Sequence, residues 1–164
     1  MSTDLTRFPR APFATTLVIG LGLVVAGVLM TQFMHLAACP LCIIQRMIYL
    51  LLALLAAVGI PLAKTAARRL VAATMALAAG LGSFVAGYQT WIQLFAPDTS
   101  CSGKMPWWEE IVDWAGQQAP VLFQADGLCS DPGWTFLGLS IAEWSLGCFV
   151  ALFLLSVYAL LRRR

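Results

Sequence analysis

Four long apolar runs constrain this chain more than any other feature of its sequence. They cover about residues 14–36, 43–63, 70–95 and 141–161, and each reaches the roughly 20 residues that a helix needs to cross a bilayer. Of the 164 residues, 60% are apolar and only 11% are charged, a composition that excludes an ordinary soluble domain. Because a segment in lipid must satisfy its own backbone hydrogen bonds, the sequence predicts an all-α membrane protein. We expect a four-transmembrane-helix bundle that forms a single membrane domain over residues 1–164.

The charged residues predict how the bundle is oriented. Eight of the ten Lys and Arg residues precede the first run, lie between the second and third, or follow the fourth. Seven of the eight acids lie in or beside the segment 96–140, which joins the third and fourth runs. By the positive-inside rule, both termini are expected on the cytoplasmic side and the segment 96–140 on the outer side.

Four of the five cysteines then fall on the outer side of the membrane. Cys39 and Cys42 lie in the short connection between the first two runs, and Cys101 and Cys129 lie in the long outer loop. Disulfides form and persist in such a compartment. The fifth, Cys148, lies within the fourth run, where a thiol usually behaves as a small apolar residue, so we expect it to be inert.

The C-x-x-C pair, Cys39 and Cys42, indicates redox chemistry. A zinc site requires further Cys or His ligands at suitable spacing, and His35 is the only histidine, so we expect no metal. Cys42 falls at the expected start of the second helix, where unpaired N–H groups and the helix dipole favour a thiolate. Arg46 lies one turn further along the same face. It can stabilise that thiolate and donate to an electron acceptor; the alternative is an arginine that snorkels to the interface.

The patterns that the sequence lacks limit which electron acceptors such a pair can use. It contains no haem ligand pair, no flavin-binding pattern and no cysteine cluster for iron and sulfur. A lipid-soluble quinone is the remaining candidate. It needs only an apolar cleft between helices with one or two polar groups, and we expect that cleft beside Arg46, between the first two helices.

The second pair of cysteines suits a different task. Cys101 and Cys129 are separated by about 27 residues, so they can meet each other, a soluble protein thiol, or the first pair. Thiol exchange depends on an accessible disulfide and on a thiolate aligned with the S–S bond, and it depends less on a rigid pocket. The alternative is a structural disulfide that staples the loop. Four cysteines allow three pairings, and the residues alone leave them open.

The outer loop also contains an amphipathic segment, "MPWWEEIVDWAGQQ". Trp107, Ile111 and Trp114 share one helical face, while the acids Glu109 and Glu110 lie opposite. Such a helix is expected to lie on the membrane surface, with its tryptophans at headgroup depth. It serves either as a structural anchor alone or as a tether that keeps the Cys101 loop near the bilayer.

Together these motifs resemble the DsbB family of bacterial inner-membrane disulfide oxidoreductases. The resemblance covers about residues 14–161 and rests on "CPLCIIQR", on the two loop cysteines that flank the Trp-rich segment, and on "WTFLGLSIAEWSLGCF" before the fourth run. It implies an exchange in which a periplasmic DsbA-like thioredoxin-fold protein attacks a Cys101–Cys129 disulfide at Cys101. Cys129 then attacks the Cys39–Cys42 pair at Cys39, and Cys42 passes two electrons to ubiquinone or menaquinone. Membrane lipid is the other expected partner, and no nucleic acid is expected.

One position departs from the family pattern. Some relatives carry a histidine near the outer end of the third span that is linked to the quinone site, whereas this chain has "GYQTWIQLF", with Gln89 in that region. A neutral amide can still donate to a quinone oxygen, so Gln89 is a candidate for quinone binding. The resemblance also leaves open a DsbI-like paralogue with a dedicated partner.

Three other hypotheses predict different proteins. "LAAC" before Cys39 resembles a lipoprotein processing site, but the preceding apolar run is longer than the usual 7 to 15 residues of a signal core, and three further spans follow. A non-enzymatic scaffold with two structural disulfides has no use for Arg46 one turn after Cys42. An oxidase resembling the vitamin K epoxide reductase group shares the chemistry, but its C-x-x-C normally lies late in its bundle.

Overall fold

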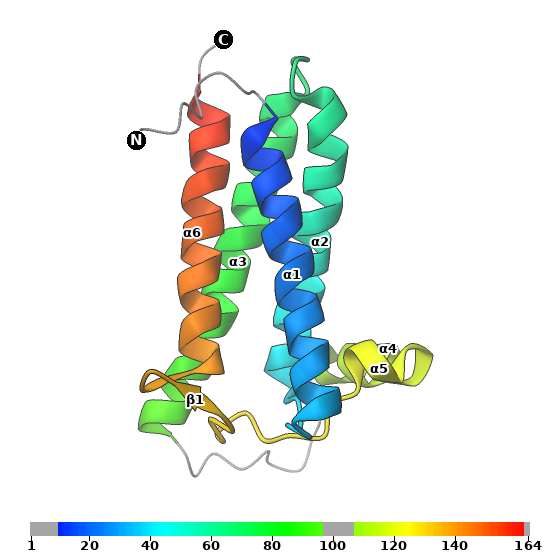
Figure 1. Cartoon of the computed structure of the whole chain (residues 1–164), viewed down its shortest axis with the longest axis vertical. Coiled ribbons are helices and arrows are strands. Elements are labelled where there is room, and N and C mark those ends of the chain that lie inside the picture. The colour runs from blue at the N-terminus through cyan, green and yellow to red at the C-terminus, as the bar shows by residue number, and fades with distance from the viewer. Residues whose placement is uncertain (1–9, 97–106, 163–164) are drawn as a thin grey trace.

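Four long helices form the body of the protein. The computed structural model describes residues 10–96 and 107–162. Its long helices are α1 (Ala11–Phe33), α2 (Pro40–Leu62), α3 (Arg68–Phe95) and α6 (Ile141–Leu161), which run side by side in Figure 1. All four are long and apolar enough to cross a membrane. The expectation of an all-α membrane protein with a four-helix bundle is therefore confirmed, whereas a single domain over the whole chain stays a prediction.

The ends of the helices follow from local sequence. Pro40 stands in the first turn of α2, where its missing N–H costs nothing. Helix α1 ends at Phe33, earlier than its apolar run, and His35 adopts a positive φ of 52° in the connection that follows. Helix α6 begins at a capping box, in which the Ser140 hydroxyl accepts from the Glu143 N–H and the Glu143 carboxylate accepts from the Ser140 N–H.

Helix α3 packs mainly on α6, and α2 packs on both α1 and α3. Phe149 holds α6 against both α2 and α3. The ring of Phe149 lies directly over Gly82, where an added Cβ would come within 2.3 Å of it. The same ring stacks on the ring of Tyr49, with centroids 4.1 Å apart. Phe149 of α6 therefore contacts both Gly82 of α3 and Tyr49 of α2.

The outer surface of the bundle is apolar. Large side chains such as Val18, Leu77, Phe84 and Leu154 are exposed along the long helices. A soluble protein rarely exposes so much contiguous apolar surface. Hydrocarbon chains of lipid suit this surface, because the backbone polar groups of the helices are already paired within them.

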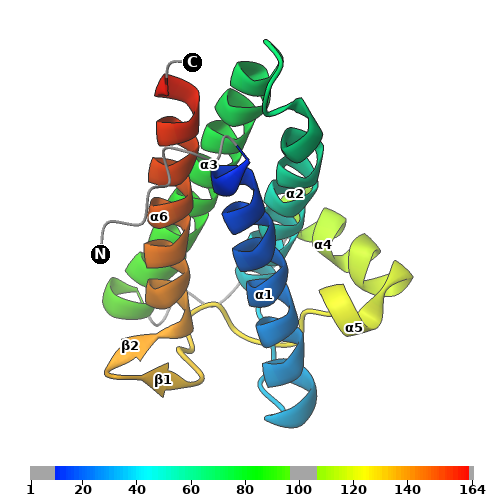
Figure 2. The same cartoon turned by 45° about the horizontal axis from the view of Figure 1, so that its top comes forward.

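Short elements gather at one end of the bundle, opposite the start of α1 and the end of α6. They are α4 (Trp107–Gln118), α5 (Pro120–Phe123), β1 (Thr135–Phe136) and β2 (Leu139–Ser140), and Figure 2 shows the hairpin beneath α6 and the two short helices beside α1 and α2. The hairpin was not predicted from sequence. Its two-residue turn, Leu137 and Gly138, has positive φ at both positions, as a type I′ turn requires.

Candidate functional site

Three cysteines meet at the beginning of α2, and we call Cys39, Cys42 and Cys129 the thiol cluster. The sulfur atoms of Cys39 and Cys42 are 2.8 Å apart. Cys129 packs against Cys39 and shares a hydrogen bond with it. All three are free cysteines in the structure. Cys101 lies outside the described residues, so its pairing stays a prediction.

The first turn of α2 supplies hydrogen-bond donors to this cluster. Cys39 occupies the N-cap, a position that usually holds Ser, Thr, Asp or Asn, and its sulfur accepts from the Cys42 N–H at 3.3 Å. The Leu41 N–H donates to the sulfur of Cys129. N–H groups at this end of a helix have no intrahelical partner. The sulfurs of both Cys39 and Cys129 therefore use donors that would otherwise be unpaired.

The hydrogen bond between Cys39 and Cys129 separates the acidities of the two thiols. It is the largest cause that raises the pKa of Cys39, followed by the hydrogen bond with Cys42 and by burial. The same bond is the largest cause that lowers the pKa of Cys129, against burial, which acts in the opposite direction. When all three are reduced, Cys39 therefore keeps its proton and Cys129 more readily becomes the thiolate.

The segment 124–129, which we call the docked loop, lies against the connection between α1 and α2. The backbone N–H groups of Asp126 and Gly127 both donate to the carbonyl of Ala38, each at 3.0 Å. Gly127 allows this approach, because an added Cβ would lie 2.4 Å from the carbonyl oxygen of Ala37. Two backbone hydrogen bonds thus hold the loop that carries Cys129 beside Cys39.

Gln89 of α3 contacts the C-x-x-C pair directly. Its amide nitrogen donates to the sulfur of Cys42 at 3.1 Å and to the sulfur of Cys39 at 3.3 Å. The side chain is only 2% exposed. Gln89 is absent from the lining of the cavity described below, so its expected role as a quinone ligand stays a prediction, and its observed contacts are with sulfur.

Gln45 is a site residue that sequence reasoning missed. It is 5% exposed, and its amide nitrogen donates to the amide oxygen of Gln89 at 2.7 Å. A signal was present, because an uncharged polar residue next to Arg46 within a long apolar helix needs a buried partner. That partner is on another helix, 44 residues away in the chain.

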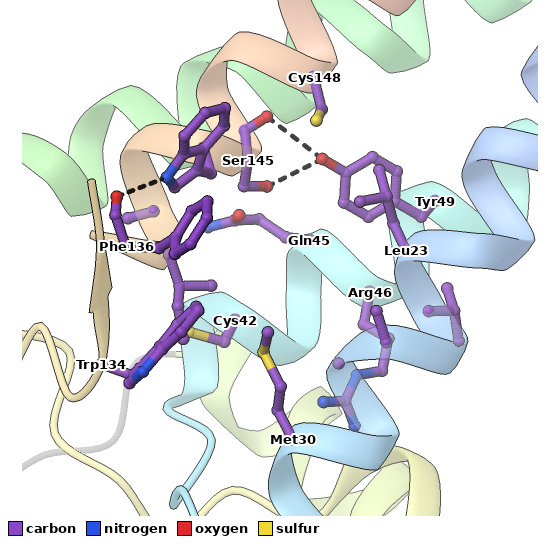
Figure 3. A pocket seen from close by; sticks show the side chains of 16 residues that line it. Leu23, Met30, Cys42, Gln45, Arg46, Tyr49, Trp134, Phe136, Ser145 and Cys148 are labelled. Atoms are coloured by element: carbon purple, nitrogen blue, oxygen red, sulfur yellow. Dashed lines mark hydrogen bonds between the residues drawn. The ribbon is translucent and has the colours of Figure 1, made fainter. Parts of the chain in front are cut away.

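A cavity of about 370 Å³ opens beside the thiol cluster, between α1, α2, α6 and the hairpin. Figure 3 shows Cys42, Gln45, Arg46 and Tyr49 of α2 along one wall, and Met30 of α1 beside them. The lining is mainly apolar. Cys42 is the member of the thiol cluster that lines it.

Aromatic side chains form the wall on the hairpin side. Trp134, Phe136 and Trp144 all line the cavity, and Trp134 and Phe136 stack with ring centroids 5.6 Å apart. The indole N–H of Trp144 donates to the carbonyl of Phe136 at 3.1 Å, which ties the hairpin to α6. The hairpin thus completes a cavity that α1, α2 and α6 leave open.

Arg46 lies between the cavity and α5. It is 7% exposed, and its guanidinium donates to the carbonyl of Leu122 and, at 3.4 Å, to the hydroxyl of Thr31. A guanidinium carries five N–H donors, and Arg46 also lines the cavity. Its charge is therefore held by hydrogen bonds within the protein.

Two further polar groups line the cavity on the side of α6. The hydroxyl of Tyr49 lies 2.9 Å from that of Ser145, and the two residues face each other in Figure 3. Cys148 also lines the cavity; its expected inertness stays a prediction. Among the described residues, no group of three or more His, Cys, Asp or Glu side chains is arranged to hold a metal ion.

Comparison with known proteins identifies relatives along nearly the whole chain. The family model described as "Disulfide bond formation protein DsbB" matches residues 9–159. A disulfide bond formation protein B of Dechloromonas aromatica is 40% identical over 158 residues, which cover 94% of this chain and 93% of that protein. One from Aromatoleum aromaticum is 34% identical over 157 residues, 94% of each chain.

Proposed function

Because the chain belongs to the DsbB family of disulfide bond formation proteins, we propose that it reoxidises a DsbA-type thioredoxin-fold protein and passes the two electrons to a membrane quinone. As a member of this family, the chain is a multi-pass membrane protein with a disulfide oxidoreductase role in disulfide bond formation. The arrangement of the thiol cluster supports the proposed exchange with the partner and the proposed electron transfer to quinone.

The proposed location is the bacterial inner membrane, with both termini cytoplasmic and the thiol cluster at the periplasmic face. The distribution of basic residues supports this orientation. Helix α4 is proposed to lie on the membrane surface. Trp107, Ile111 and Trp114 are exposed, whereas Val112 and Ala115 are buried against the rest of the protein, which supports an apolar face free to contact lipid.

The proposed exchange begins at Cys101. A thiolate of the reduced partner attacks a Cys101–Cys129 disulfide at Cys101, which forms a mixed disulfide and releases Cys129. The partner's second thiol then displaces Cys101, and the partner leaves oxidised. Cys129 attacks Cys39 of a Cys39–Cys42 disulfide and releases Cys42 as a thiolate. Attack by Cys101 on Cys129 restores the loop disulfide and leaves Cys39 and Cys42 reduced.

One observation carries this order of events. Cys129 contacts Cys39, and Cys42, the other member of the pair, lines the apolar cavity. Attack at Cys39 therefore makes Cys42 the leaving group, at the place where an acceptor dissolved in the membrane can approach. The exchanges conserve electrons, because each disulfide that breaks is matched by one that forms.

The cavity suits a quinone as substrate. Its apolar lining fits a ring that partitions into lipid, and Arg46, Gln45 and the Tyr49–Ser145 pair offer hydrogen bonds to ring oxygens. The quinone accepts two electrons and two protons as the Cys39–Cys42 disulfide re-forms. Arg46 is proposed to donate to a quinone oxygen and to stabilise the Cys42 thiolate across the same cavity.

The proposal is tested by mixing the purified protein anaerobically with a reduced DsbA-like protein and ubiquinone while the quinone absorbance is followed. We expect quinone reduction by the native chain and none by Cys42→Ser. Thr74→Ala, which lies on α3 away from the site, should reduce quinone at the native rate. If the native chain leaves quinone oxidised while a known DsbB protein reduces it, the proposal is wrong. A DsbI-like protein or a scaffold with structural disulfides would give that result.

A further inference from the structure

Two glutamine side chains, Gln45 and Gln89, connect the C-x-x-C pair to the wall of the cavity. The Gln89 amide nitrogen reaches both sulfurs of the pair, and the Gln89 amide oxygen accepts from Gln45 at 2.7 Å. The two side chains are 5% and 2% exposed. Gln45 also lines the cavity, as does Cys42.

The orientation of the Gln89 amide determines what it does to the sulfurs. One end of an amide donates hydrogen bonds and the other end accepts them. Gln45 presents a donor to the Gln89 oxygen, so the donor end of Gln89 must face Cys39 and Cys42. Without Gln45, rotation of the amide by half a turn would place its oxygen against the sulfurs instead.

A donor at this position favours one redox state of the pair. A thiolate only accepts hydrogen bonds, and bonds to a charged acceptor are roughly twice as strong as bonds between neutral groups. The sulfurs of a disulfide carry no such charge. The Gln89 amide therefore stabilises the reduced pair, with the Cys42 thiolate released, more than it stabilises the disulfide.

We propose that Gln45 and Gln89 are positioning residues that make the Cys39–Cys42 disulfide more oxidising, with Gln45 acting on the pair through the orientation of Gln89. This inference goes beyond the proposed function, because it concerns the redox equilibrium of the pair and requires neither partner nor quinone. Its consequence for the proposed exchange is that Cys42 becomes a better leaving group when Cys129 attacks Cys39.

The position of Gln89 separates this role from direct acceptor binding. The cavity lining includes Gln45 but not Gln89. Gln89 therefore acts on sulfur from the side of α3, while Gln45 contributes from α2 and touches both the cavity and Gln89. A purely structural pair would hold α2 and α3 together without changing the redox equilibrium, and that difference is measurable.

The experiment measures the reduction potential of Cys39–Cys42 in the full chain, with Cys101, Cys129 and Cys148 replaced by Ser. The protein is equilibrated with dithiothreitol buffers of graded ratio, and the fraction reduced is read by alkylation and mass. For Gln89→Met, which keeps the length of the side chain but removes its hydrogen bonds, we expect the equilibrium constant for reduction to fall about tenfold. For a two-electron couple this is a shift of about 30 mV to a more negative potential.

Coupling between the two residues provides the second readout. Gln45→Met alone should shift the potential in the same direction, and in the Gln89→Met background it should add nothing further. Gln93→Met is the matched control on α3, because the Gln93 amide bonds to Asp131 and Ser140 and not to sulfur. Its potential should equal that of the native pair.

Two results would overturn the inference. One is an equilibrium constant for reduction that stays within twofold of the native value in a Gln89→Met chain whose melting temperature is unchanged. The other is a Gln45→Met shift that persists in full when Gln89 is already Met. If Gln89→Met does not fold, Gln45→Met still decides, because an unchanged potential there contradicts the orienting role. Failure of quinone reduction leaves this measurement unaffected, so the two proposals are tested separately.

Discussion

Substitution of Gly127 by Ala tests most directly whether the docked loop delivers Cys129 to Cys39. The added Cβ would lie 2.4 Å from the Ala37 carbonyl oxygen and 2.9 Å from its carbonyl carbon. Both are backbone atoms, so no side chain can rotate away to make room. The loop must retreat by about 1 Å to reach an ordinary contact distance, near 3.4 Å.

The retreat would break the contacts that hold the loop. The N–H groups of Asp126 and Gly127 donate to the Ala38 carbonyl at 3.0 Å, and a further 1 Å puts both beyond hydrogen-bonding distance. Each such bond contributes about 0.5 to 1.5 kcal/mol net. A loss of about 1.4 kcal/mol corresponds to a tenfold change in an equilibrium constant, so we expect Gly127→Ala to lower the effective concentration of Cys129 at Cys39 by about tenfold or more.

The assay uses a chain in which Cys39 and Cys129 are the only cysteines, with Ser at positions 42, 101 and 148. The ratio of Cys39–Cys129 disulfide to dithiol in glutathione buffers gives the effective concentration of one thiol at the other. Gly22→Ala is the matched control, because a Cβ at Gly22 meets no atom within 4 Å. An effective concentration for Gly127→Ala within twofold of the control would refute the reasoning.

Three further outcomes are expected. Arg46→Ala should raise the apparent KM for quinone by about tenfold or more, the contribution of a hydrogen bond from a charged donor, whereas Arg69→Ala, exposed at the far end of the bundle, should leave it unchanged. In the fully reduced protein, iodoacetamide should modify Cys129 at a lower pH than an ordinary thiol, because the pKa of Cys129 is lowered. It should modify Cys39 only at a higher pH, because the pKa of Cys39 is raised. Cys39→Ala should move the pH midpoint of Cys129 modification back up. Leu137→Asn should raise the melting temperature, since asparagine tolerates the positive φ of 54° at a cost lower by about 1 kcal/mol.

The four long helices could be predicted from sequence because lipid imposes one simple requirement. A run of about 20 apolar residues has few alternatives to a spanning helix. The hairpin could not be predicted in this way, because each strand has only two residues and Leu137–Gly138 lacks the Asn-Gly or Asp-Gly pattern typical of a type I′ turn. Its stability depends on contacts with α3 and α6, such as the hydrogen bond from Ser140 to Gln93.

The site was only partly accessible to sequence reasoning, for a related reason. Cys42 and Arg46 are one turn apart on one helix, so helical spacing places both on one wall, and both line the cavity. Gln45 and Gln89 come from different helices, and their contact depends on how α2 and α3 pack. The spacing of Cys129 carries no information about the docked loop, because the hydrogen bonds of that loop to Ala38 involve backbone atoms only.

Burial explains why two pairs of cysteines serve the proposed reaction better than one. Cys39 is 3% exposed and lies beside the docked loop, so a folded partner cannot align its own sulfur with the Cys39–Cys42 bond, as exchange requires. Cys42 must nevertheless stay at the cavity if its electrons are to reach an acceptor in the membrane. A single pair cannot be both open to a soluble protein and buried at that depth. Cys129 resolves the conflict, because it belongs to a short surface segment that reaches Cys39 through two backbone hydrogen bonds to Ala38.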